Sequence, residues 1–230
     1  MSIRQPSPSP LVRDLAQRIC RDISPAALKV ATGKLDQVRA ALRAAHPLKV
    51  YFLGTQALAE HTNLRAAIPV GWRFLILRGK RAVAATEITL AKREGGPRWV
   101  YTSYDSRQHI QLQTIERMIS DSRLVKRRYE LRFLRIPGLD LNGLLWLHSA
   151  GGADDRIVQL GTSSMLRAGW QYSVEQLLAR LRPHAERRRQ RQPKRKRPIS
   201  GSSGARARTG PLVKIQPAGA GRKTSRRGKE

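Results

Sequence analysis

Cysteine is nearly absent from this chain, and long apolar runs are missing. Cys20 is the only cysteine among 230 residues, which excludes an intramolecular disulfide and a zinc site built from several cysteines. No run approaches the roughly 18 apolar residues that a membrane span requires. The Ser/Pro-rich start at residues 1–10 lacks the apolar centre of a secretory signal. We therefore expect a cytoplasmic protein without a membrane span.

Acidic residues are also scarce. The chain has 16 Asp or Glu against 45 Lys or Arg, a net charge of +29 with a pI near 11.7. Residues 182–230 hold 17 of the basic residues and two acidic ones, so this segment carries +15, about half of the total. Because apolar residues nearly disappear there, burial cannot offset the entropy cost of ordering the chain. We expect a disordered basic C-terminal tail over residues 182–230.

The tail predicts a polyanionic partner. Spaced cations on a mobile chain bind nucleic acid through its phosphates without reading its sequence. An acidic protein, an anionic lipid surface or solubility alone are the alternatives. Residues 187–198 also resemble a basic nuclear-import signal, so the expected location is cytoplasmic or nucleoid-associated in a bacterium and nuclear in a eukaryote. The predicted binding residues of the tail are Arg187, Arg188, Arg189, Arg191, Lys194, Arg195, Lys196 and Arg197.

The start of the chain predicts an arm followed by two helices. Three prolines within residues 1–10 favour an extended, mobile arm. Apolar residues at helical spacing predict a helix over 11–22. Ser24-Pro25 is typical of a helix start, and an apolar stripe at steps of three and four predicts a second helix over 24–45. His46-Pro47 marks the end of the helical pattern.

The rest of the domain, to residue 181, reads as strands with two further helices. Short apolar and β-branched runs separated by turn residues predict strands at 50–53, 72–77, 82–90, 99–104, 129–133, 141–148 and 156–160. Turns are expected at 78–80 and at Gly151-Gly152, and a short helix over 114–122. A capping box at Ser173 and Gln176 predicts a closing helix whose packed part ends at Pro183. Residues 11–181 are therefore expected to form a single α+β domain: an antiparallel sheet of about five to seven strands with helices on one face.

A second basic segment precedes the strand that begins at Tyr129. Together with Arg132 and Arg135 it predicts a cationic stripe along the sheet, where Tyr101 and Tyr104 would add stacking surfaces for single-stranded nucleic acid. The alternative is a solvated strand face with its aromatic residues in the core. The predicted binding residues of this segment are Arg123, Lys126, Arg127 and Arg128.

Motifs for catalysis, metal or nucleotide binding are not found, and no cofactor is predicted. The five histidines show no close metal-ligand spacing. Asp154-Asp155 with Asp140 would be the only anchor for a metal-dependent hydrolase, although aspartates in a glycine-rich turn usually serve the turn. The leading hypothesis is non-catalytic, sequence-independent nucleic-acid binding. The alternative is a protein-interaction or scaffold module with the tail as an accessory, and the oligomeric state is left open.

Overall fold

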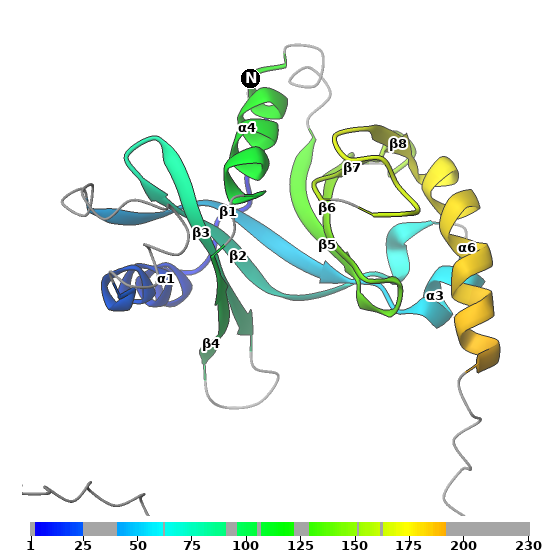
Figure 1. Ribbon diagram of the computed structural model, residues 1–230, viewed down its shortest axis with the longest axis horizontal. Helices are drawn as coiled ribbons and strands as arrows, with labels where there is room; N and C mark the ends of the chain where they lie inside the picture. The colour runs from blue at the N-terminus through cyan, green and yellow to red at the C-terminus, as the bar shows by residue number, and fades with distance from the viewer. Residues whose placement is uncertain are drawn as a thin grey trace, which may run out of the picture. The chain divides into compact units, whose positions relative to one another are not determined.

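The computed structural model describes residues 3–24, 41–61, 63–90, 96–104, 107–121, 129–150, 152–161 and 163–191. All of them belong to one compact unit, Met1–Pro193, which has the predicted α+β composition (Figure 1). None of its described helices is long and apolar enough to cross a lipid bilayer. The described α-helices are α1 (Pro10–Asp22), α3 (Thr55–Glu60), α4 (Arg107–Ser120) and α6 (Val174–Arg191), with the 3-10 helices η1 (Leu64–Ala66) and η2 (Pro137–Leu139).

One eight-stranded sheet runs through the unit in the order β4-β3-β2-β1-β5-β6-β7-β8. Two antiparallel meanders, β1 to β4 and β5 to β8, meet at the parallel pair β1 and β5, where Val50 lies opposite Phe133. The sheet is therefore mixed, and the predicted all-antiparallel sheet of five to seven strands is wrong in both respects. The strands are β1 (Leu42–Phe52), β2 (Ile68–Arg78), β3 (Arg81–Leu90), β4 (Pro97–Ser103), β5 (Glu130–Ile136), β6 (Leu141–His148), β7 (Arg156–Gln159) and β8 (Gln171–Ser173).

The parallel pair results from the connection through α4. After β4 at one edge, the chain passes through α4 and returns as β5 beside β1, the first strand of the first meander. Parallel neighbours need such a crossover, usually through a helix. A strand pattern in the sequence shows that a strand forms but not which distant strand it pairs with.

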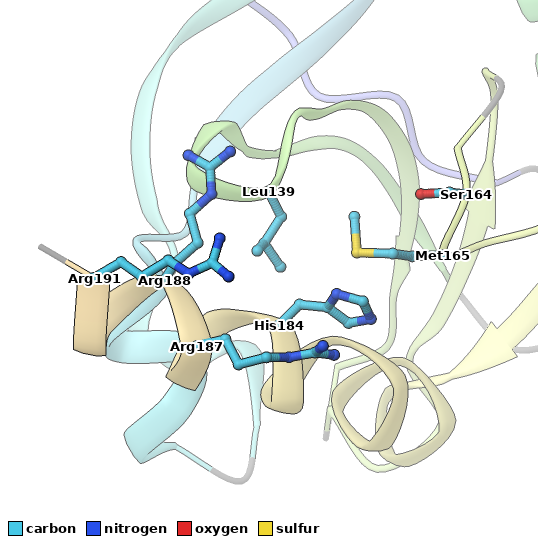
Figure 2. Close-up of a pocket in the computed structure, with 7 residues that line it drawn as sticks. All are labelled: Leu139, Ser164, Met165, His184, Arg187, Arg188 and Arg191. Atoms are coloured by element: carbon cyan, nitrogen blue, oxygen red, sulfur yellow. The ribbon is translucent and has the colours of Figure 1, made fainter.

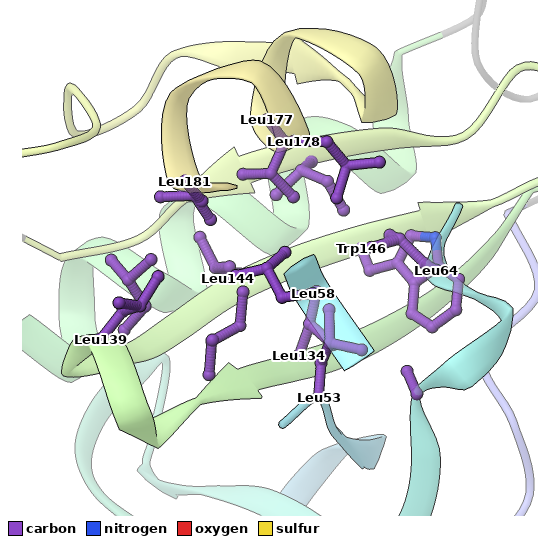
Figure 3. Close-up of a cluster of buried hydrophobic side chains, with 14 of the residues drawn as sticks. Leu53, Leu58, Leu64, Leu134, Leu139, Leu144, Trp146, Leu177, Leu178 and Leu181 are labelled. Carbon is purple, nitrogen blue, oxygen red and sulfur yellow. The ribbon is translucent and has the colours of Figure 1, made fainter. Parts of the chain in front are cut away.

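Helices pack on both faces of the sheet, which corrects the expectation of one covered face. Successive residues of a strand point to opposite faces. Phe74 of β2 packs with Val12 and Ala16 of α1, whereas its neighbour Leu75 belongs to the cluster that contains Ile115 of α4. In the second meander, α3 and α6 cover a third cluster, which includes the residues labelled in Figure 3.

The N-terminal residues differ from the predicted arm. Ile3 is only 3% exposed and joins the core cluster beneath α4. The Arg4 amide donates to the Tyr129 carbonyl at 2.9 Å, and the Leu131 amide donates to the Arg4 carbonyl at 3.1 Å. Residues 3–5 are therefore tied to β5, because an apolar side chain and free strand hydrogen bonds outweigh the extended bias of the nearby prolines.

The second helix, predicted over residues 24–45, can be compared with the structure only at its ends. Residues 25–40 lie outside the described part of the chain, but residues 42–45 belong to β1, so the predicted end at residue 45 is wrong. These residues pair with β2, where Ala44 lies opposite Ile76. A bulge follows between Ala45 and Leu48, and His46 takes a positive φ of 48°. The His46-Pro47 break is thus a bulge inside a strand, since bulges allow one strand to bend without ending.

Most other local predictions are confirmed. Gly79 has a φ of 58° in the tight turn between β2 and β3, a conformation that favours glycine. β6 and β7 form the predicted hairpin. The short helix predicted at 114–122 is the second half of α4.

Candidate polyanion-binding site

The closing helix α6 begins as the sequence predicts. The Ser173 amide donates to Gln176 Oε1 at 3.0 Å, and the Gln176 amide donates to Ser173 Oγ at 3.1 Å. This reciprocal pair is the capping box, and it satisfies two amides that the first helical turn leaves free. The apolar face of the helix packs on the second meander with the buried residues Leu177, Leu178, Leu181 and Ala185 (Figure 3).

The predicted end of the packed helix at Pro183 is wrong, because α6 continues to Arg191. Proline removes one intrahelical hydrogen bond and strains the preceding turn. Contacts on both sides of this proline stabilise the continuation: Arg182, just before it, donates to the His61 carbonyl at 2.6 Å, and Ala185, beyond it, is fully buried. Arg189 forms an ion pair with Glu60 of α3 at 3.3 Å. Residues 182–191, expected in the disordered tail, are therefore helical.

One side of α6 is apolar in its first half and basic in its second half. Leu177, Leu181, His184, Arg188 and Arg191 follow one another at steps of four and three, so they share one side of the helix. The first two are buried against the sheet, whereas Arg188 and Arg191 are exposed. The same side of α6 thus contacts the core at its start and presents arginines at its end.

These arginines line a hollow of about 250 Å³ at the C-terminal end of α6. Figure 2 shows Arg187, Arg188, Arg191 and His184 on the helix, with Leu139, Met165 and Ser164 around the rest of the hollow. Leu139 comes from η2, and the other two come from the segment before β8. The hollow therefore combines four basic side chains of one helix with a hydroxyl group and two apolar side chains from η2 and from the segment before β8.

The hollow has a strongly positive lining. None of its lining residues is acidic, and within the described ranges the side chains of Arg188 and Arg191 form no ion pair or hydrogen bond. Arg187 donates through Nε to the Pro183 carbonyl at 3.1 Å, which leaves its terminal nitrogens open. Guanidinium groups near a helix C-terminus also interact favourably with the helix dipole, so they stabilise α6 as well. Open guanidinium forks of this kind match the oxygens of a phosphate group.

The structure brings together three of the twelve predicted binding residues. Arg187, Arg188 and Arg191 line the hollow, whereas Arg189 points to α3 and its Glu60 partner. The remaining predictions fall outside the described residues: Lys194, Arg195, Lys196 and Arg197 of the tail, and Arg123, Lys126, Arg127 and Arg128 before β5.

The predicted cationic stripe along the sheet is not a solvent-facing platform at Arg135 and Tyr101. β5 lies inside the sheet, between β1 and β6. Arg135 donates to the buried Glu87 and to the Tyr101 hydroxyl, and its guanidinium carbon lies 5.4 Å from the Tyr101 ring centre. Tyr101 in turn donates to Glu87 at 2.9 Å. Both residues thus belong to an internal ionic network, and Tyr101 does not offer an open stacking face.

The aspartates proposed for a metal site serve other contacts. Asp155 is buried and accepts hydrogen bonds from Trp146 Nε1 at 2.9 Å and from the Ser149 amide at 2.7 Å. Asp140 follows η2 and accepts from Asn142 at 3.2 Å. No group of three or more His, Cys, Asp or Glu suited to a metal ion occurs in the part of the chain that the structure describes. The aspartates in the glycine-rich hairpin are therefore turn residues.

The basic hollow was missed because the prediction ended the helix at Pro183. Continuing the steps of four and three from Leu177 and Leu181 through this proline would have placed His184, Arg188 and Arg191 on one side. The loop residues Ser164 and Met165 carry no comparable signal, since their approach to α6 depends on the folding of the second meander.

Comparison with known proteins identifies no relative. No protein-family model matches the chain, and no curated protein or solved structure is significantly similar to it. Function is therefore inferred from the geometry and charge of the molecule alone.

Proposed function

We propose that this protein binds nucleic acid without sequence specificity, through the basic end of α6 and the basic segment that follows it. The observation that carries the proposal is the hollow at Arg187, Arg188 and Arg191, which has three guanidinium groups and no acidic lining residue. Residues 194–230 add 12 lysines or arginines and one acidic residue. Phosphate is the group that such a concentration of cations recognises on nucleic acid.

The absence of sequence readout follows from the type of contact. Arginine binds phosphate oxygens as a planar fork, and every phosphate of a strand is equivalent to it. Counterions released from the nucleic acid supply most of the binding free energy, so affinity falls steeply with salt. The helix end gives a fixed phosphate contact, and the residues that follow it in the sequence add further cations.

Binding to several nucleic acids tests the proposal. Full-length protein is titrated at several salt concentrations with two duplex DNAs of unrelated sequence and equal length, and with single-stranded DNA and RNA. We expect the two duplexes to bind with equal affinity and the affinity to fall linearly in a plot of log K against log salt. A strong preference for one sequence, or binding that does not depend on salt, would overturn the proposal.

A second candidate function is binding of a protein partner at β4. This strand is at the edge of the sheet, and its Trp99 and Val100 are 56% and 52% exposed. An edge strand has free backbone groups that an extended peptide can pair with. A pull-down with the full chain should then keep its partner after nuclease treatment, and Trp99→Thr should release it. Loss of every partner upon nuclease treatment would exclude this function.

A further inference from the structure

A second hollow, of about 430 Å³, lies where β1, β5 and β6 meet η1. It shares no lining residue with the basic hollow on α6. Its volume lies in the range of about 300 to 1,000 Å³ that small-molecule sites occupy. Its polar and aromatic lining residues include Tyr51, Arg65, Arg132, Trp146, His148 and Asp155.

Arg132 is held in place on the wall of this hollow. Its guanidinium carbon lies 4.7 Å from the ring centre of Tyr51 and 5.1 Å from that of Trp146. Nε donates to Glu130 at 2.9 Å, and the terminal nitrogens bond to none of the described residues. The side chain is 16% exposed. The two rings, which meet edge to face, and Glu130 therefore hold in place a guanidinium whose outer edge is free, the arrangement that binds an anion with two parallel hydrogen bonds.

His148 is oriented by a buried carboxylate in the same wall. Its Nδ1 lies 3.3 Å from Asp155 Oδ2, which also accepts from Trp146 Nε1. Asp155 Oδ1 accepts from the amide and the hydroxyl of Ser149, so the carboxylate is fully engaged. A carboxylate at Nδ1 fixes the imidazole ring and leaves Nε2 as the outer nitrogen. Nε2 makes no hydrogen bond within the described ranges.

The lining of the hollow has two guanidinium groups and one carboxylate. Arg132 is free at its outer edge, and Arg65 on η1 adds a second guanidinium that is exposed and forms no ion pair with the described residues. Both oxygens of Asp155, the one acidic lining residue, accept hydrogen bonds from residues of the wall. Leu64, Ala67 and Val174 supply apolar wall on the remaining sides. A ligand that matches this lining has an anionic group and an apolar or planar body.

We propose that this hollow binds a phosphate monoester attached to a small organic body. Like a phosphorylated side chain, a phosphate monoester carries a charge of about −1.5 to −2 near pH 7 and has three acceptor oxygens. Two guanidinium groups are therefore matched better by a phosphate monoester than by a single carboxylate. Arg132 and Arg65 bind the phosphate, His148 Nε2 contacts a hydroxyl group of the ligand, and the apolar wall covers the body. The body is required because the hollow is far larger than a phosphate group.

Calorimetric titration of the full-length protein with adenosine 5′-monophosphate and with adenosine tests this site. The nucleotide should bind at least about tenfold more tightly than the nucleoside, because the charge-assisted hydrogen bonds depend on the phosphate. Arg132→Gln and Arg65→Gln should each weaken nucleotide binding by about tenfold. Arg65 is exposed, so its variant keeps the test valid even if Arg132→Gln disturbs folding.

A triple variant on the other hollow, Arg187→Gln with Arg188→Gln and Arg191→Gln, is the control. It lowers the net charge by three but should leave nucleotide affinity unchanged, which separates this site from the proposed polyanion surface. Equal affinity for nucleotide and nucleoside, or unchanged affinity in Arg65→Gln, would exclude a free nucleotide as the ligand.

The phosphate monoester has two sources, a free nucleotide or the end of a nucleic-acid strand. A 5′-phosphorylated tetranucleotide and its 5′-hydroxyl form distinguish them. If the phosphorylated strand binds at least about tenfold more tightly than its hydroxyl form and Arg65→Gln removes the difference, the site accepts strand ends. If the mononucleotide alone shows this dependence, the ligand is a free nucleotide. Failure of both probes to depend on Arg65 contradicts the site.

Discussion

Arg73 and Glu87 form a buried ion pair across β2 and β3, with Nη1 2.7 Å from Oε1 and side chains only 5% and 6% exposed. Arg135 and Tyr101 also donate to this carboxylate. One buried carboxylate thus compensates two guanidinium groups, and Gln108 and Gln111 accept further hydrogen bonds from Arg73 at 3.0 and 3.3 Å. The network thus connects three strands of the first meander, β2, β3 and β4, with β5 and α4.

Replacing the shared carboxylate should therefore cost more than replacing one arginine. Glu87→Gln leaves the buried guanidinium of Arg73 and the part-buried one of Arg135 without a counterion, and we expect it to lower the free energy of unfolding by about 3 to 5 kcal/mol. Arg73→Met should cost less, because Arg135 and Tyr101 remain on Glu87. Urea denaturation measures both. Glu60→Gln, which removes the exposed partner of Arg189, is the control and should cost less than about 1 kcal/mol. A smaller loss for Glu87→Gln than for Arg73→Met would contradict this account of the network.

At Gly71, β2 leaves no room for a side chain beside β3. A Cβ atom at this position would overlap the carbonyl oxygen of Ile88, a backbone atom that cannot move without opening the strand pair. Gly71→Ala should therefore destabilise the protein by about 1 to 3 kcal/mol, the usual cost of overpacking. Gly161→Ala is the matched control, because a Cβ there meets nothing within 4 Å. Equal thermal stability of the two variants would show that the strands are not this close.

Cys20 is expected to be unreactive in the folded chain. It is buried on α1, and burial raises the pKa of its thiol from 9.0 to about 11. Only the thiolate reacts with disulfide reagents, so labelling at about pH 8 should be slow in the native protein and fast in urea. Since this is the only cysteine, the absorbance change reports on one site. Fast native labelling would place the thiol at the surface.

The same shift gives stability a dependence on alkaline pH. The folded-state pKa lies above the unfolded value, so the contribution of Cys20 is complete below about pH 9 and is lost as the pH rises toward about 11. The stability difference between the native chain and Cys20→Ala should shrink across this interval. A difference that stays constant from pH 8 to pH 11 would contradict the burial of the thiol.

His46 should make the protein sensitive to mild acid. Burial lowers the pKa of His46 below its usual 6.5, with Glu116 opposing this effect and Arg43 adding to it. The unfolded chain therefore binds the proton first, so the contribution of His46 is complete above about pH 6.5 and is lost as the pH falls through the folded-state pKa. His46→Asn removes the titrating group but tolerates the positive φ of 48°. We expect the variant to lose less stability than the native chain between about pH 7 and pH 5. Parallel stability curves for the two proteins would contradict the shift.

Local sequence patterns predicted most individual helices, strands and turns. They could not predict which strands distant in the sequence pair with one another. The capping box at Ser173, the turn at Gly79 and the β6–β7 hairpin depend on residues a few positions apart, and all three are confirmed. The parallel pairing of β1 with β5 depends on segments that are far apart in the chain, and no local pattern specifies it. The pairing of Arg4 with the strand beside Tyr129 is long-range in the same way.

The candidate sites show the same difference between local sequence features and features that depend on the tertiary fold. The arginines at 187, 188 and 191 were predicted from charge alone, but their arrangement on one side of a helix depends on packing that carries α6 past Pro183. The hollow at Arg132 and His148 assembles residues from β1, β5, β6 and η1, so its composition becomes visible only when the sheet is formed. The number of charged residues can be counted in a sequence, but the fold decides which of these side chains lie next to one another.

The salt dependence of DNA binding by two charge-matched variants tests the central claim most directly. One variant replaces Arg187, Arg188 and Arg191 of α6 with glutamine, and the other replaces Arg13, Arg18 and Arg21, which are exposed on α1. Both lose three charges. Each lost phosphate contact on duplex DNA should reduce the slope of log K against log salt by about 0.9. The account predicts a slope reduced by about 2 to 3 in the α6 variant and little changed in the α1 variant. Equal slopes in the two variants, or an unchanged slope in the α6 variant, would contradict it.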